Sequence, residues 1–199
     1  SPNIVFADAD WQIAAAASPM SVFANTGQDC CARSRMFIER SIYDNFAERF
    51  VAATKKIVVG DPTKAETQLG PLVSANQRAT VEEFIADARN RGSKFACGGA
   101  RPHPKGYYLE PTVLLDVGKS DRCWREEIFG PVLQVVRWSG DVDAVVDQVN
   151  ALGYGLTLGV QTRIDSRAER IAERARVGNV YVNRNMIGAV VGVQPFGGE

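Results

Sequence analysis

A cysteine at position 30 is the residue of this sequence best suited to covalent chemistry. Cys30 follows a polar turn at residues 25–29, itself after a helical stretch, so its thiol could face a cleft. Cysteine is a strong nucleophile as a thiolate, but only about 3% is ionised at neutral pH when its pKa is ordinary. The alternative interpretation is a small buried apolar residue, and it is the only one for Cys31, Cys97 and Cys123.

A pair of acids followed by an aromatic residue forms the second candidate. The segment 126–131 reads Glu-Glu-Ile-Phe-Gly-Pro and runs into a predicted strand. One carboxylate and one ring could therefore lie at a site. The alternative is an acidic surface loop, which is the commoner setting for such residues.

The third candidate is the C-terminal segment 183–198, where Gly188 and Gly192 flank small apolar residues. Glycines at these positions would let the backbone approach a ligand closely. The alternative is an apolar loop buried beneath its neighbours. By contrast, Gly153-Tyr154-Gly155 precedes a predicted strand and lacks the third glycine of a dinucleotide fingerprint, so we interpret it as a tight turn.

Composition excludes several classes of function. The 199 residues carry 23 basic and 23 acidic side chains, so no charge excess favours a nucleic-acid partner. The longest uncharged run, residues 11–28, contains Pro19 and Asn25 and is not a membrane span. The sole histidine, His103, and the lack of a Cys-x-x-Cys pair argue against a metal site. The cysteine usage fits a reducing, cytoplasmic setting.

The elements that must position these residues alternate between strands and helices. Apolar runs predict strands at 3–7, 35–38, 95–97, 108–114, 132–138, 156–160 and 180–182. Periodic patterns predict helices at 11–23 with a disturbance at Pro19, then from capping boxes at Ser41–Asp44 and Ser74–Gln77, and at 141–150 and 165–176. This alternation indicates an α/β fold with a mostly parallel twisted sheet flanked by helices, in one domain over residues 1–199.

Taken together, the candidate segments resemble the aldehyde dehydrogenase superfamily. Gly27-Gln28-Asp29-Cys30 is similar to its Gly-Gln-x-Cys nucleophile loop, and 126–131 to a diagnostic family motif. Further segments that recur in family order are Gly60-Asp61-Pro62, Gly70-Pro71-Leu72, Gly106–Thr112 and Pro195–Gly198. The resemblance covers essentially the whole chain and implies the catalytic, nucleophile-bearing domain.

The resemblance assigns roles to three residues. It implies that Cys30 is the nucleophile, that Glu127 binds the nicotinamide ribose, and that Phe129 packs against the nicotinamide ring of NAD or NADP. The implied activity is oxidation of a small-molecule aldehyde to a carboxylic acid through a cysteine thiohemiacetal and thioester. The intact protein is expected to be a homo-oligomer without nucleic-acid or membrane partners.

The C-terminal part resembles glutamate-semialdehyde (1-pyrroline-5-carboxylate) dehydrogenase, an enzyme of proline breakdown. In that branch the loop equivalent to Gly188 and Ala189 binds the substrate's carboxylate, and Phe196 packs on its carbon chain. That branch usually places Ser after the nucleophile, whereas Cys31 stands here. The region around Cys30 instead resembles broad-range and betaine-type aldehyde dehydrogenases.

The chain also reads as part of a longer protein. In the family, Ser-Pro-Asn typically follows a stretch whose Glu is the general base, and that residue would lie just before Ser1. We therefore expect the isolated 199 residues to be inactive, with the dinucleotide bound mainly by another domain. Two alternatives remain open, namely a relative that transfers the acyl group to CoA and a non-catalytic scaffold.

Overall fold

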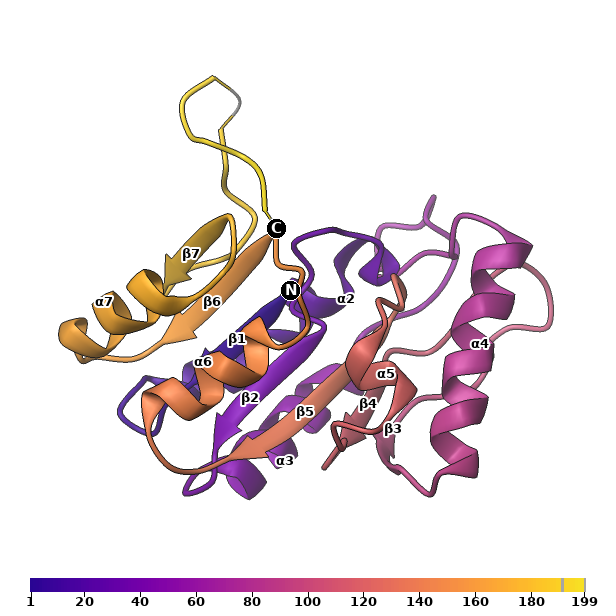
Figure 1. Cartoon of the computed structure of the whole chain (residues 1–199). Helices are drawn as coiled ribbons and strands as arrows, with labels where there is room; N and C mark the ends of the chain where they lie inside the picture. The colour runs from indigo at the N-terminus through magenta and orange to yellow at the C-terminus, as the bar shows by residue number, and fades with distance from the viewer. Residues whose placement is uncertain (191, 199) are drawn as a thin grey trace.

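The computed structural model describes residues 1–190 and 192–198, which are built around one seven-stranded sheet (Figure 1). Its strands are β1 (Pro2–Val5), β2 (Arg35–Glu39), β3 (Lys94–Cys97), β4 (Thr112–Leu115), β5 (Val132–Trp138), β6 (Thr157–Gln161) and β7 (Asn179–Val182). Their order across the sheet is β3-β4-β5-β2-β1-β6-β7. Every neighbouring pair is parallel except β3 and β4, which are antiparallel.

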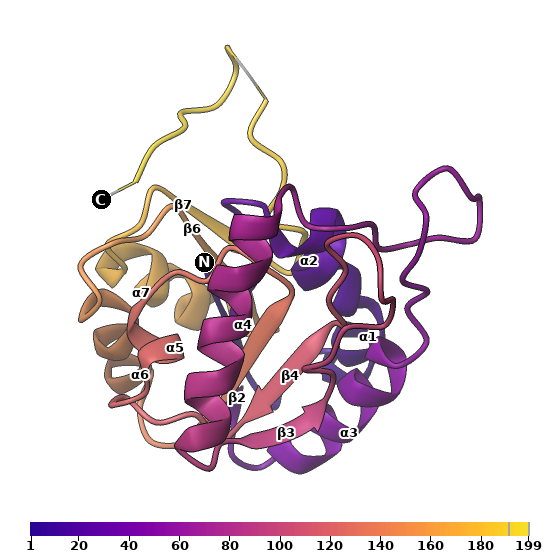
Figure 2. The same cartoon turned by 90° about the vertical axis from the view of Figure 1, so that its right-hand side faces the viewer.

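Helices cover both faces of this sheet (Figure 2). They are α1 (Trp11–Ala17), α2 (Pro19–Phe23), the short 3₁₀ helix η1 (Ala24–Gly27), α3 (Tyr43–Thr54), α4 (Ala75–Asn90), α5 (Arg122–Arg125), α6 (Val142–Asn150) and α7 (Asp165–Arg174). One face carries α1, α2 and α3, and the other carries α4 to α7. Among the described residues, none of the helices is both long enough and apolar enough to cross a bilayer.

Two apolar cores hold the layers together. Every residue of β1 and of β4 is buried, as expected for central strands covered on both faces. On the α1–α3 side, Phe46 and Phe50 of α3 stack at 6.1 Å between ring centroids. On the other side, Phe37 of β2 meets Trp124 of α5 edge to face at 5.5 Å. Each such fully buried side chain contributes roughly 1.5–3 kcal/mol.

The predicted fold class is confirmed, and most predicted elements occur within a residue or two of their expected bounds. Pro19 divides the first helical stretch, as its missing N–H requires. The predicted strand at 108–114 is shorter, because Pro111 cannot donate to the ladder and β4 begins after it. Helix α5 was not predicted, since four residues carry too little periodicity.

Of the two predicted capping boxes, one is wrong and one is half confirmed. The N-cap of α3 is Ile42, and the Ser41 hydroxyl instead donates to the Glu39 carboxylate at 3.2 Å. At α4, the Ser74 hydroxyl accepts a hydrogen bond from the Gln77 N–H at 3.1 Å, as expected. The Gln77 side chain does not reach back to Ser74, however, and contacts another loop.

After β7 the chain forms a long loop that projects from the body and then returns towards it (Figure 1). On its return the Asn179 side-chain amide donates to the Pro195 carbonyl at 3.2 Å. A side chain at Gly178 would overlap the Gly197 carbonyl, so this contact is backbone against backbone. Val191, within the C-terminal candidate segment, lies outside the described residues.

Candidate active site

The register of two parallel strands brings the cysteine segment beside the acid–aromatic segment. Strands β2 and β5 are adjacent, with Arg35 paired to Gln134. Cys30 precedes Arg35 by as many residues as Phe129 precedes Gln134. Because both strands run in the same direction, the two segments that lead into them meet at one edge of the sheet.

Direct backbone contact joins these two segments at Gly27. This residue has φ +69°, a conformation that favours glycine. A Cβ added to Gly27 would overlap the carbonyl of Gly130 and lie 3.0 Å from the nitrogen of Pro131. Only a glycine therefore allows the turn before Cys30 to pack this closely on the second segment.

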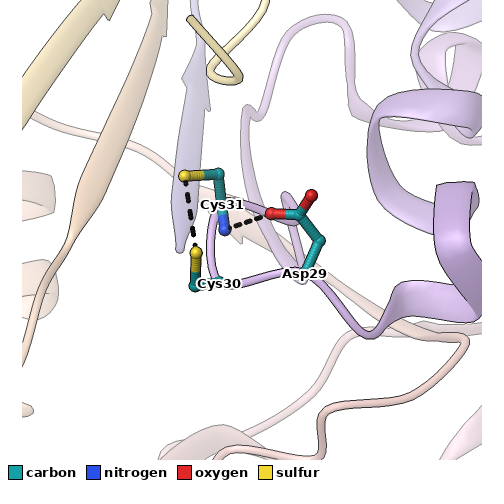
Figure 3. Close-up of side chains that lie close together, drawn as sticks. All are labelled: Asp29, Cys30 and Cys31. Carbon is teal, nitrogen blue, oxygen red and sulfur yellow. Dashed lines mark hydrogen bonds between the residues drawn. The ribbon is translucent and has the colours of Figure 1, made fainter. Parts of the chain in front are cut away.

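The cysteine turn separates two adjacent thiols into different environments (Figure 3). The Cys31 N–H donates to the Asp29 carboxylate at 2.7 Å, and the Cys31 side chain is buried. Burial, followed by the neighbouring Cys30, raises the pKa of the Cys31 thiol to about 11. Cys30 is exposed, and its Sγ lies 4.0 Å from that of Cys31. Of the two sulfurs, Cys30 is the one open to an incoming molecule.

A glutamine at the start of α4 holds the second segment in an uncommon conformation. Phe129 has φ +54°, which is sparsely populated for residues with a Cβ. The Gln77 amide donates to the carbonyls of Ile128 at 3.2 Å and of Phe129 at 2.8 Å. In this conformation Phe129 is 40% exposed. The next acid upstream, Glu127, is exposed, and no hydrogen bond or ion pair engages its carboxylate among the described residues.

The loop before α4 also anchors the cysteine turn. The Thr26 hydroxyl donates to the Gly70 carbonyl at 3.1 Å, and the Gln28 side chain accepts from the Val73 N–H at 3.0 Å. Thr26 itself has φ +59°. These bonds hold the strained turn against the loop before α4, and Gly130 contacts the same turn at Gly27.

The C-terminal candidate residues belong to the loop that follows β7. Gly188 is half-buried beside Arg184 and Tyr181, Ala189 is half-buried, and Phe196 is 62% exposed. Within residues 1–190 and 192–198, no hydrogen bond joins Gly188, Ala189 or Phe196 to Cys30. The connection between the two regions is indirect. The buried Arg33 guanidinium, three residues after Cys30, donates to the Arg184 carbonyl at 2.6 Å.

Comparison with known proteins decides the family. A model of the aldehyde dehydrogenase family matches residues 1–199. The chain belongs to the aldehyde dehydrogenase family. It is 41% identical to a betaine aldehyde dehydrogenase of Mesorhizobium japonicum, over 100% of this chain and 41% of that protein. It is 38% identical to a 1-pyrroline-5-carboxylate dehydrogenase of Bacillus subtilis, over 98% of this chain and 38% of that protein.

Solved structures of aldehyde dehydrogenases share the fold. The structure of 1-pyrroline-5-carboxylate dehydrogenase from Thermus with bound NAD matches 100% of this chain and 38% of its own, with a TM-score of 0.92 and 38% identity. The chain spans about two fifths of the length of the curated relatives it matches. Membership of the aldehyde dehydrogenase family, expected from the motifs, is therefore confirmed.

Sequence reasoning missed two residues that shape this candidate site. Gln77 was assigned to a capping box, and nothing in the sequence showed that its amide would hold the Phe129 loop. Arg33 was not singled out, although a charged residue between Ala32 and the start of a buried strand was a usable signal. Its side chain is 4% exposed.

Proposed function

We propose that the protein carrying this sequence oxidises an aldehyde to a carboxylic acid with NAD(P)⁺, using Cys30 as the nucleophile. The observation that carries the proposal is the contact between the exposed-thiol turn and the Glu127–Phe129 segment, made at Gly27 and Gly130. Family membership supports it, as does the NAD bound to the Thermus relative. The isolated 199 residues are expected to be inactive, since the curated relatives are about two and a half times as long.

Cys30 begins the reaction by forming a carbon–sulfur bond. Its thiolate adds to the aldehyde carbon and gives a tetrahedral thiohemiacetal with a negative oxygen. Such an oxyanion needs hydrogen-bond donors that are not already engaged. The Cys31 N–H is bonded to Asp29, whereas the Cys30 N–H donates to no group among the described residues. We assign the Cys30 N–H as one donor to the oxyanion.

Glu127 and Phe129 fit the nicotinamide half of a dinucleotide. The exposed Glu127 carboxylate, which has no partner among the described residues, can accept hydrogen bonds from two ribose hydroxyls. The exposed Phe129 ring, on a backbone that Gln77 holds, offers an apolar face to a flat heterocycle. When bound there, NAD(P)⁺ would supply the acceptor for the hydride of the thiohemiacetal carbon. The residues of this chain contribute orientation, and hydrolysis of the resulting Cys30 thioester releases the acid.

A carboxylate-bearing aldehyde such as glutamate semialdehyde is the proposed substrate. Backbone N–H groups at Gly188 and Ala189 would bind its carboxylate, and Phe196 would cover its carbon chain. The 38% identity to the Bacillus subtilis 1-pyrroline-5-carboxylate dehydrogenase supports this choice. The assay that tests it compares kcat/KM of the full-length protein for glutamate semialdehyde and for an uncharged aliphatic aldehyde. A preference for the uncharged aldehyde contradicts the substrate assignment and leaves the role of Cys30 intact.

The role of Cys30 is tested by replacing its sulfur. In the full-length protein, Cys30→Ala removes the sulfur that is proposed to hold the acyl group, so turnover should fall by at least about 10⁴-fold. Binding of NAD⁺, followed by fluorescence, should be retained. The matched control is Cys97→Ser, a half-buried cysteine on β3 whose replacement should leave turnover unchanged. Normal turnover by Cys30→Ala would contradict the proposal.

A further inference from the structure

The cysteine turn also gathers three groups that bind metal ions. One carboxylate oxygen of Asp29 and the sulfurs of Cys30 and Cys31 all lie within 4.8 Å of one another. The two sulfurs face each other across the turn, with the Asp29 carboxylate beside the Cys31 backbone (Figure 3). We call this cluster the Asp29–Cys31 triad. It contains one more thiol than the proposed reaction needs, because thiol catalysis uses only one sulfur.

The sulfur separation matches the geometry of a tetrahedral thiolate site. With Zn–S bonds of about 2.3 Å, two thiolates on one zinc ion stand about 3.8 Å apart. The observed separation of Cys30 and Cys31 is 4.0 Å, so the two sulfurs need to move by only a few tenths of an ångström. Adjacent cysteines therefore present a nearly formed pair of ligands.

The third ligand is partly oriented already. Asp29 accepts the Cys31 N–H with one oxygen, Oδ1, at 2.7 Å. One of its two oxygens lies within 4.8 Å of both sulfurs, and its Oδ2 makes no hydrogen bond within the described residues. The bond to Cys31 keeps the carboxylate beside the two thiols, much as groups around a metal site orient its ligands.

We propose that Asp29, Cys30 and Cys31 form an inhibitory site for a thiophilic divalent cation such as Zn²⁺. Two thiolates and one carboxylate favour zinc or cadmium over magnesium or calcium, which prefer oxygen ligands. Binding releases the two thiol protons to solvent, forms two metal–sulfur bonds and one metal–oxygen bond, and leaves one position for water. The cation enters from the side of the exposed Cys30.

Metal binding should inhibit aldehyde oxidation, because the metal ion occupies the sulfur lone pair with which Cys30 would attack the aldehyde. Only this consequence rests on the proposed function. The site itself depends on the geometry of the Asp29–Cys31 triad and can be observed in a protein that shows no turnover at all.

The test uses the full-length protein, reduced and freed of metal, with Co²⁺ as the spectroscopic probe. Cobalt bound to two thiolates gives intense sulfur-to-metal absorption in the near ultraviolet, and added Zn²⁺ should abolish that absorption. In Cys31→Ser the absorption should fall by about half or more, because one thiolate is lost. In Asp29→Asn the acceptor for the Cys31 N–H remains but the charge is lost, so both thiolates still bind and the affinity should fall about tenfold or more.

Activity measurements then test the inhibitory consequence, with each variant compared with its own metal-free rate. Zn²⁺ should inhibit the unmodified protein reversibly, with activity restored by a chelator. The concentration for half inhibition should rise at least about tenfold in Cys31→Ser and in Asp29→Asn. Cys97→Ser, a thiol outside the triad, should remain as sensitive as the unmodified protein.

Two results would overturn the metal site. One is the absence of thiolate-to-cobalt absorption in the unmodified protein, and the other is equal absorption and equal zinc affinity in that protein and in Asp29→Asn, provided both are folded by circular dichroism. If cobalt binds as expected but no aldehyde is oxidised, the site stands and the proposed function fails. The two proposals are therefore separable.

Discussion

At the scale of single residues, burial distinguishes two thiols that are neighbours in the sequence. Cys30 is exposed and Cys31 is buried, although both belong to the same turn. The sequence alone left Cys30 as either a nucleophile or a buried apolar residue, and only the family resemblance favoured Cys30. The structure adds the burial that separates the two thiols, with the Cys31 N–H held by the Asp29 carboxylate and the Cys31 side chain buried.

Thiol labelling should therefore be selective. With limiting iodoacetamide at pH 7.5, Cys30 should react first, because it is exposed. The pKa of Cys31 is raised to about 11 by burial and then by Cys30, which leaves well under about 0.1% of it as thiolate at that pH. Burial raises the pKa of Cys123 to about 11 as well, so this thiol serves as an internal control. Peptide mapping with isotopic reagents measures the rates. Labelling of Cys31 as fast as Cys30 would contradict this interpretation.

At the scale of elements, the site depends on how loops are held against one another at the strand ends. The sequence predicted β2 and β5 closely, but it did not predict that they are neighbours. The adjacency of these two strands arises from long-range packing, and the local periodicity of the sequence does not indicate it. The Gln77 contact with the Phe129 loop was hidden for the same reason, because a capping box describes only the helix that contains it.

The glycine between the two site loops gives the sharpest test at this scale. Gly27→Ala places a Cβ into the Gly130 carbonyl and should push the Cys30 turn away, so kcat/KM should fall about a hundredfold or more. Gly92→Ala is the matched control. Its φ is +77°, similar to that of Gly27, but nothing lies within 4 Å of the added Cβ. The control should lose about 1 kcal/mol of stability and no activity. Equal activity losses in both variants would show that backbone strain, not loop contact, is responsible.

The Gln77 amide should act on cofactor binding. Gln77→Met keeps the length of the side chain but removes both hydrogen bonds to the Ile128 and Phe129 carbonyls. Losing contacts worth about 1 kcal/mol should raise KM for NAD⁺ roughly five- to tenfold in the full-length protein. Ser74→Ala is the control, because it removes the α4 cap at a similar cost in stability while leaving the amide in place. A similar rise in KM for both variants would assign the effect to α4 as a whole.

At the scale of the whole molecule, the N-terminal strand lies inside the sheet, between β2 and β6. The alternation of strands and helices predicted a parallel sheet, and that much is confirmed. It could not predict the strand order. Strands β1 and β6 are about 150 residues apart in the sequence, and their pairing depends on how the helices and the sheet pack together. Beyond the end of β1, Asp8 contacts the segment that follows β6.

Asp8 joins the segment after β1 to the segment after β6 through contacts with its carboxylate. The Thr162 hydroxyl donates at 2.7 Å, the Arg163 N–H donates at 2.6 Å, and the Arg167 guanidinium forms an ion pair with it. Burial acts to raise the pKa of Asp8, but the Thr162 and Arg163 hydrogen bonds and the Arg167 charge outweigh it, so the pKa is lowered. Stability gained in this way is present above the unfolded pKa of about 3.9 and is lost as pH falls through the lower folded value.

Asp8→Asn should therefore lower the free energy of unfolding by about 1–3 kcal/mol at pH 7, with the difference shrinking as the pH falls below about 4. Urea unfolding followed by circular dichroism across this pH range measures it. Asp147→Asn is the control, because Asp147 pairs with Arg174 on the surface and is 59% exposed, and its loss should cost no more than about 1 kcal/mol. A difference for Asp8→Asn that stayed constant down to pH 2 would show that shape, and not the ionised carboxylate, links β1 to β6.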